Sequence, residues 1–261
     1  MHAASPDRLL LPGEPGPFEL IGASGARRLV LVCDHAGRRF PHALGQLGLP
    51  PEATWRHISW DLGAGELTRA LAARLGATAI LATYSRLVMD CNRAIENPTA
   101  FSVAGDGHRI RGNETLTPQA RAARMQAIHT PYHEQLSSLI DERIVEGPTA
   151  LVSIHSFTPV LNGRARPWTA GVLWDQDARM AAPLLAALRI QGRGLIGDNE
   201  PYSGRLPADY TLHRHGAARG LPHVSVEVRQ DGLLTPAGVL QWADGLASAL
   251  RPILVRLGVT P

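Results

Sequence analysis

The stretch LVSIHSFTP, residues 151–159, decides the fold. Its opening run of apolar and β-branched residues is typical of a strand that is buried on both faces of a sheet. His155 lies at the end of this run, and Pro159 stops the strand after two hydroxyl-bearing residues. A histidine in this position is either a core residue satisfied by a neighbour or a group that the strand delivers to a site.

Short apolar strands alternate with helices of ten or more residues along the rest of the chain. Strands are predicted within 28–33, 78–93, 149–157, 169–175 and 221–233, and helices within 61–75, 116–147, 177–192 and 235–258. This order predicts an α/β fold, a three-layer α/β/α sandwich with a mixed, mostly parallel sheet. Residues 1–26 are rich in Pro, Gly and Ala and are expected to form a partly ordered N-terminal lead-in, followed by a single domain over 27–261.

Composition excludes several classes of function. The 261 residues include no lysine, which removes a Schiff-base lysine, a phosphate-loop lysine and a Ser–Lys dyad. With only Cys33 and Cys91, a disulfide framework is not expected and a four-cysteine zinc site is impossible. The net charge of +3 comes from scattered arginines, so no nucleic-acid partner is expected. The absence of a long apolar run or a signal sequence predicts a cytoplasmic protein with no membrane partner.

Polar residues gather at the ends of the predicted strands, where open α/β sheets bind their ligands. The four strand ends carry Asp34-His35, Asp90 with Asn92 and Arg93, His155-Ser156, and Glu227 with Arg229 and Asp231. Burying this many ionisable groups is unfavourable unless they pair or bind a metal. Two imidazoles and one carboxylate form the usual ligand set of a catalytic zinc site, and a further glutamate can take a proton from water.

Seven segments together resemble the N-formylglutamate amidohydrolase family. They are CDHAG, SWDLGA, SRLVMDCNR, SIHSFTP, NEPYSG, LHRHG and VEVRQDGL, in this order, and the similarity covers about residues 28–245. The family is related in fold to the zinc carboxypeptidases and the aspartoacylases. The resemblance therefore implies a zinc-carboxypeptidase-like (phosphorylase/hydrolase-like) sandwich that binds Zn²⁺ and hydrolyses a small-molecule N-acyl amino acid.

The resemblance also implies roles for individual residues. His35 and His155 would be zinc ligands, and Glu227 the general base. Arg86 would polarise the carbonyl of the substrate, while Asn92 with Arg93 would hold its α-carboxylate.

The carboxylate ligand departs from the carboxypeptidase pattern His-x-x-Glu, because Arg38 stands three residues after His35. Asp61 in SWDLGAG is the first choice for this ligand, although the same residue is equally expected as the N-cap of the following helix. Asp34 and Asp90 are the reserves.

Other polar residues carry two interpretations each. His129 and His133 stand at i and i+4, where they could bind a metal, but Pro131 lies between them and helix packing or cleft lining explains them as well. Tyr202, Ser203 and His215 could line an acyl pocket, and turn chemistry is the alternative for Tyr202 and Ser203. Loop arginines could select an acidic side chain or simply belong to the surface; they are Arg164, Arg166 and Arg205.

The sequence thus predicts a zinc-dependent amidohydrolase whose substrate is an N-formyl or N-acyl amino acid such as N-formyl-L-glutamate. Two alternatives remain open. One is a carboxypeptidase-like metallopeptidase that uses the same metal site on a longer substrate. The other is a non-catalytic relative that binds a carboxylate ligand.

Overall fold

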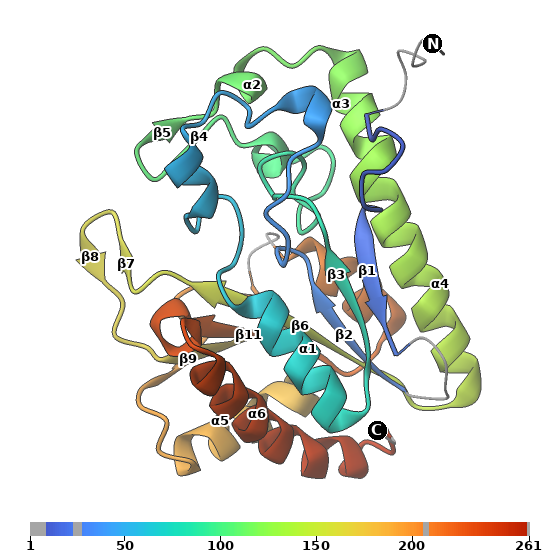
Figure 1. Ribbon diagram of the computed structural model, residues 1–261. Coiled ribbons are helices and arrows are strands. Elements are labelled where there is room, and N and C mark those ends of the chain that lie inside the picture. The colour runs from blue at the N-terminus through green and yellow to red at the C-terminus, as the bar shows by residue number, and fades with distance from the viewer. Residues whose placement is uncertain (1–8, 23–27, 206–208, 260–261) are drawn as a thin grey trace.

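The computed structural model describes residues 9–22, 28–205 and 209–259, and its centre is a seven-stranded sheet (Figure 1). The strands follow the order β1 (Phe18–Ile21), β3 (Thr78–Ala82), β2 (Leu29–Cys33), β6 (Ala150–Phe157), β11 (His223–Arg229), β9 (Ala170–Leu173) and β10 (Ile196–Asp198). The four strands from β3 to β11 are parallel, whereas β1 and the β9–β10 pair run antiparallel to their neighbours in that block. The predicted α/β class with a mixed, mostly parallel sheet is confirmed.

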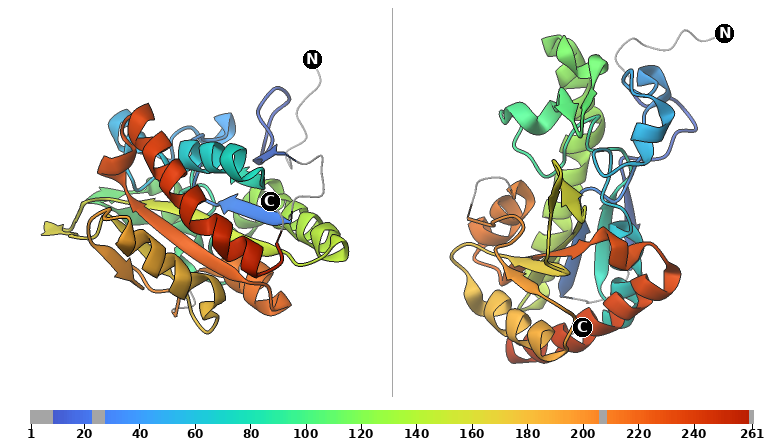
Figure 2. Two further views of the ribbon diagram at one scale, coloured as in Figure 1. Left: turned by 90° about the horizontal axis from the view of Figure 1, so that it is seen from below. Right: turned by 90° about the vertical axis from the view of Figure 1, so that its left-hand side faces the viewer.

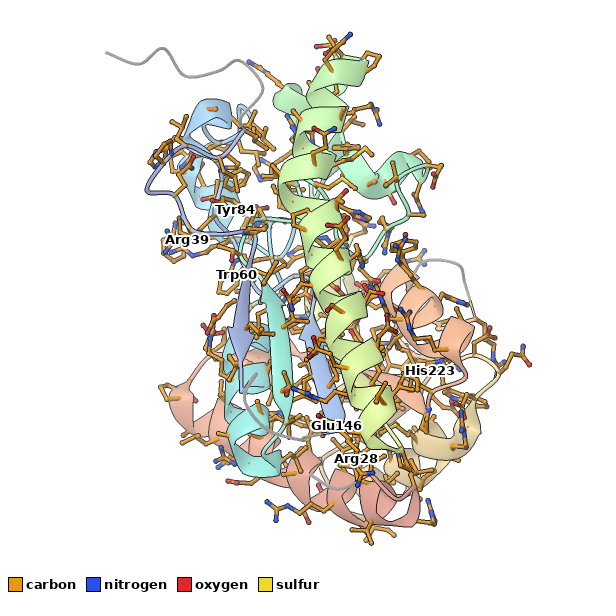
Figure 3. The ribbon with its side chains drawn as sticks, turned by 90° about the vertical axis from the view of Figure 1, so that its right-hand side faces the viewer. Arg28, Arg39, Trp60, Tyr84, Glu146 and His223 are labelled. Atoms are coloured by element: carbon orange, nitrogen blue, oxygen red, sulfur yellow. The ribbon has the colours of Figure 1, made fainter. Side chains whose placement is uncertain are left out.

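Helices cover both faces of the sheet (Figure 2). Alternate side chains of β2 divide between two cores: Leu29 and Leu31 pack with α1 (Ala64–Leu75), α5 (Ala178–Ile190) and α6 (Pro236–Arg256). Val30 and Val32 pack instead with α4 (Thr130–Glu146), which lies across the other face in Figure 3. Every residue of β2 and β6 is buried, as expected for strands enclosed by two helical layers.

The long helical stretch predicted within 116–147 begins at Pro118 and changes its hydrogen-bond pattern just before Pro131. Thr117 is the N-cap of α3 (Pro118–Arg124), and its hydroxyl accepts the N–H of Ala120. A π-helical turn, Met125–His129, then leads into α4, which has Pro131 in its first turn. Because proline has no N–H to donate, the regular hydrogen-bond pattern shifts at this point.

Several short elements were not predicted from the sequence. The strand β1 falls within the expected lead-in, of which residues 1–8 and 23–26 lie outside the described residues. The sequence also missed β10, the helix α2 (Arg111–Glu114) and two hairpins, β4–β5 (Ala104–Gly105, His108–Arg109) and β7–β8 (Val160–Leu161, Arg164–Ala165). Segments of two to four residues are too short for periodicity to reveal them.

The carboxyl ends of β2, β3, β6 and β11 meet at one edge of the sheet because these strands are parallel neighbours. His155 and Glu227 are partners in the register of β6 and β11, so both side chains leave the sheet on the same face. In the part of the chain that the structure describes, no helix combines the length and apolarity needed to cross a membrane.

Candidate active site

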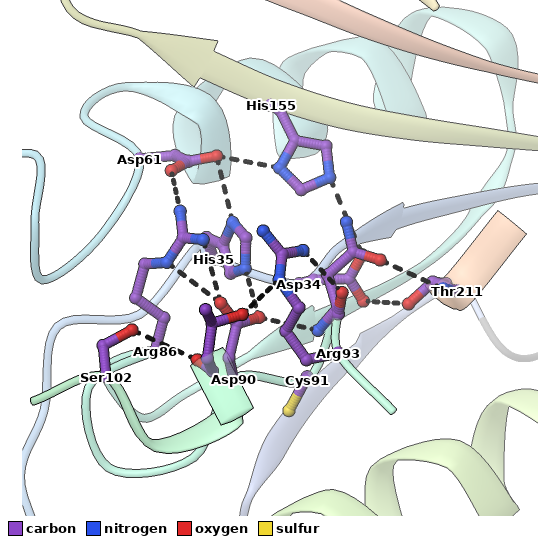
Figure 4. Close-up of polar contacts among 12 residues, drawn as sticks. Asp34, His35, Asp61, Arg86, Asp90, Cys91, Arg93, Ser102, His155 and Thr211 are labelled. Carbon is purple, nitrogen blue, oxygen red and sulfur yellow. Dashed lines mark hydrogen bonds and ion pairs between the residues drawn. The ribbon is translucent and has the colours of Figure 1, made fainter. Parts of the chain in front are cut away.

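Three side chains converge at the carboxyl ends of β2 and β6 (Figure 4). Asp61 Oδ2 lies 2.8 Å from His155 Nδ1 and 3.4 Å from His35 Nδ1. All three residues are buried, and their ligand atoms lie within 4.8 Å of one another. Among the described residues, this is the group of three whose donor atoms are close enough to share a metal ion.

Asp61 reaches this position through the backbone rather than as a helix cap. Its N–H donates to the carbonyl of His35 over 2.9 Å, which places the aspartate beside the first histidine. The expectation of an Asp61 N-cap is wrong: α1 begins at Ala64, and the N-cap is Gly63, whose φ of 77° suits glycine. The Asp61 carboxylate is therefore available to the two histidines.

The other two candidate aspartates, Asp34 and Asp90, lie on the Nε2 side of the histidines, opposite to Asp61. Asp90 Oδ1 is 2.7 Å from His35 Nε2, and Asp34 Oδ2 is 3.7 Å from His155 Nε2. Asp90 is itself held by Arg86, whose Nη2 donates to Oδ2 over 2.8 Å. A carboxylate hydrogen-bonded to the far nitrogen fixes the tautomer and orientation of a metal-binding histidine, so the arrangement fits Asp61 as the ligand and Asp90 as the group that orients His35. Asp34 Oδ2 and His155 Nε2 have no hydrogen-bond partner among the described residues.

The donor set fits a zinc ion on structural grounds. Two imidazole nitrogens and one carboxylate oxygen face one another, which is the three-ligand set of a catalytic zinc site. Four carboxylates are buried around these histidines, and few cations accompany them; they are Asp34, Asp61, Asp90 and Glu227. Burial by itself lowers the pKa of His155, but the contact with Asp61 and the charges of Glu227 and Asp34 raise it to about 10. The surroundings thus favour a positive charge between these groups.

Glu227 is buried beside this cluster of charged groups. Burial raises the pKa of its carboxyl to about 7, although the positive charge of His155 acts in the opposite direction. Its Oε2 is buried and has no hydrogen-bond partner among the described residues. A carboxylate with a pKa near neutrality and an unused oxygen is suited to accept and return a proton.

A cavity of about 600 Å³ lies in front of these groups, and most of the predicted site residues line it. Of the predicted residues, the following line it: His35, Asp61, Arg86, Asn92, Arg93, His155, Tyr202 and Glu227. Ser203 lines it too, together with several residues that the sequence analysis did not single out, among them His57, Asn199 and Ser225. His57 reaches the cavity from a loop that no local pattern marks, and Asn199 belongs to the NEPYSG segment. Ser225 lies on β11 two residues before Glu227, so the alternation of side chains along a strand was a signal that could have found it.

His215 does not line the cavity, which corrects the expectation that it contributes to an acyl pocket. Its side chain is fully buried, and its Nε2 lies 2.9 Å from His133 Nδ1. His133 Nε2 donates to the carbonyl of Cys91 over 2.8 Å, so its Nδ1 accepts from His215. Burial lowers the pKa of both imidazoles, for His215 to about 3, so the pair is neutral.

His129 and His133 belong to the same hydrogen-bond network and bind backbone carbonyls. His129 Nε2 donates to the carbonyl of Arg93 over 3.1 Å, so the two histidines hold the carbonyls at both sides of Asn92. Thr211, next to the His215 turn, donates its N–H to Asn92 Oδ1 over 3.0 Å. These residues position the loop that carries Asn92 and Arg93, which is the helix packing that the sequence analysis kept as an alternative.

Comparison with known proteins identifies the family of the chain. The model of the N-formylglutamate amidohydrolase family matches residues 27–234. The chain is 25% identical over 240 residues to an N-formylglutamate deformylase of Pseudomonas aeruginosa, covering 81% of this chain and 90% of the relative. The resemblance found in the sequence is confirmed by both findings.

Solved structures extend the comparison to the fold. A gene product of Agrobacterium tumefaciens superposes with a TM-score of 0.92 at 32% identity, covering 96% of this chain and 100% of the other. The N-formylglutamate amidohydrolase of Ralstonia eutropha superposes with a TM-score of 0.68 at 20% identity, over 94% of this chain and 100% of the other, and so shares the fold. With the family model matching most of its length, the chain belongs to the N-formylglutamate amidohydrolase family and is an amidohydrolase.

Proposed function

We propose that the protein uses a zinc ion to hydrolyse the amide bond of an N-formyl amino acid such as N-formyl-L-glutamate. The observation that carries this proposal is the convergence of His35, Asp61 and His155 in a cavity that Glu227 also lines. His35 Nδ1, His155 Nδ1 and Asp61 Oδ2 would hold the ion. When bound, zinc supplies Lewis acidity, which makes water easier to deprotonate and an amide carbonyl easier to attack.

Glu227 is assigned the proton transfers. It takes a proton from the attacking water and returns it to the amine nitrogen as the C–N bond of the amide breaks, releasing formate and the free amino acid. Its burial supports this role, because a carboxyl with a pKa of about 7 can both accept and donate near neutrality.

Arg86 and the loop after it are assigned to the substrate. Arg86 carries its charge into the cavity, held by Asp90 and by Asp61 at 3.6 Å, where it would polarise the carbonyl oxygen. Asn92 and Arg93 line the same cavity and would bind the α-carboxylate, and Tyr202 would contact the substrate from the opposite half of the sheet.

The test is a Glu227→Gln variant assayed for formate release from N-formyl-L-glutamate and for bound metal by mass spectrometry. Loss of a general base is expected to lower kcat by about 10²- to 10⁴-fold, with zinc still bound stoichiometrically. Glu66→Gln, on the exposed side of α1, is the matched control and should behave as the wild type. Near-normal turnover by Glu227→Gln, or wild-type activity that survives chelation of all metal, would contradict the mechanism.

A further inference from the structure

Arg166 is a buried cation at the edge of the cavity without a carboxylate partner among the described residues. Only 9% of the residue is exposed, and none of those residues places a carboxylate within ion-pair distance of its guanidinium. Its Nη1 donates to the hydroxyl of Tyr202 over 2.9 Å. This hydrogen bond uses one of the five N–H donors of the guanidinium, so others are available to an anion.

The surroundings of Arg166 belong to the cavity that holds the candidate catalytic groups. Its Cζ lies 4.7 Å from the ring centre of Tyr202 and 5.6 Å from that of Phe157, and both aromatic residues line the cavity. His57 lines it as well; burial lowers its pKa, the charge of Asp106 acts in the opposite direction, and the charges of Arg56, Arg166 and Arg86 lower it further. Arg166 is not itself a lining residue, but its guanidinium packs against two lining aromatic rings at the edge of the cavity.

The backbone of Arg166 is fixed on both sides. Its N–H donates to the carbonyl of Pro159, closing the β7–β8 hairpin, and its own carbonyl accepts from Arg229 Nη1 over 3.1 Å. Arg229 lies two residues after Glu227 on β11, so the hairpin is tied to the strand that carries the candidate base. Arg124, another buried guanidinium, differs in its partners, because its Nη1 and Nη2 donate to three carbonyl-type oxygens of the surrounding loops.

We propose that Arg166 and Tyr202 form an anion subsite that binds the side-chain carboxylate of an acidic N-formyl amino acid. This inference rests on the proposed function, because it concerns the second carboxylate of the same substrate. Asn92 and Arg93 follow β3 on one side of the sheet, whereas Arg166 and Tyr202 adjoin β9 and β10 on the other. A substrate with two carboxylates can thus engage both halves, and Tyr202 gains a specific role: its hydroxyl accepts from Arg166 and donates its own proton to the carboxylate.

The experiment compares N-formyl-L-glutamate with N-formyl-L-glutamine, which has the same shape without the side-chain charge. The wild type is expected to favour the glutamate substrate in kcat/KM by about 10- to 100-fold, as for a charge-assisted hydrogen-bonded contact. Arg166→Gln should abolish this preference, chiefly through KM, and leave kcat/KM for the glutamine substrate within about threefold. Tyr202→Phe should lose part of the preference, and Arg166→Lys should restore part of it.

Arg164→Gln is the matched control, because Arg164 is exposed on the same hairpin two residues earlier. Calorimetric binding of L-glutamate and L-glutamine provides a second readout that needs no turnover: Arg166→Gln should weaken only the binding of glutamate. Equal losses for both substrates, or a wild type that does not distinguish them, would overturn the subsite. If the wild type releases no formate from either substrate while Arg166-dependent glutamate binding persists, the proposed function fails and the subsite stands.

Discussion

Replacing His215 with glutamine should flatten the dependence of stability on pH between about pH 7.5 and pH 5. The His215 imidazole is fully buried and neutral, and burial together with the charges of Arg219 and Arg214 lowers its pKa to about 3. In the unfolded chain a histidine titrates near its ordinary value of about 6.5. Above that value neither the folded nor the unfolded state binds a proton at this site, so the contribution of His215 to the free energy of unfolding is fully present.

As the pH falls below about 6.5, only the unfolded state takes up the proton, so the free energy of unfolding decreases until the pH approaches 3. One pKa unit corresponds to about 1.4 kcal/mol, and pH 5 lies about 1.5 units below the pKa of the unfolded chain. Protonation of His215 therefore stabilises the unfolded state by about 2 kcal/mol at pH 5. Glutamine does not titrate, and its amide can donate to His133 in place of the imidazole. The variant therefore lacks this part of the acid sensitivity, whatever its stability at neutral pH.

Urea unfolding of the two proteins at four values from about pH 7.5 to pH 5, in the same buffer and metal concentration, measures the difference. The wild type should lose about 2 kcal/mol more than His215→Gln over this range, with equal m-values. His42→Gln, which removes an imidazole that is exposed rather than buried, is the matched control for the loss of a histidine. Identical slopes for the wild type and His215→Gln would show that the imidazole is not held neutral in the folded state.

Two further predictions concern the site. Asp61→Asn should abolish stoichiometric zinc binding, as measured by competition with a chelator. Asp90→Asn changes the hydrogen bond to His35 Nε2 and the ion pair with Arg86 but no ligand atom, and it should weaken zinc binding by about 10- to 100-fold. The reverse order of effects would exchange the roles of the two aspartates. Gly171→Ala places a Cβ against the carbonyl oxygen of Glu200 and should displace the loop that carries Tyr202, which raises KM for N-formyl-L-glutamate. Gly16→Ala is the control: its Cβ meets only the carbonyl oxygen of Phe18 at 3.9 Å, and KM should not change. An unchanged KM for Gly171→Ala would show that the loop position does not matter for binding.

The strands of the central block and some helix starts were predictable because their signals are local, although the N-cap expected at Asp61 was wrong. The apolar run before His155 predicts β6, and Thr117 and Thr235 are N-caps whose hydroxyls accept backbone N–H groups, as the Thr-Pro pairs indicate. The family was also recognisable, since its segments occur in order along most of the chain. Elements of two to four residues, such as β1 and β7–β8, give no period and were missed.

The sequence by itself determined the α/β order of elements, the family, and the pair of histidines delivered by strand ends. The tertiary structure decided which aspartate faces those histidines, because Asp61 is brought to His155 across 94 residues and to His35 by a backbone hydrogen bond, while Asp90 approaches from behind. The tertiary structure also places the His215 side chain in the core, in contact with His133, and the Arg166 guanidinium next to the Tyr202 hydroxyl. Local periodicity reports which residues are buried, whereas the direction in which a loop side chain points depends on contacts between distant segments, which form only when the layers pack together.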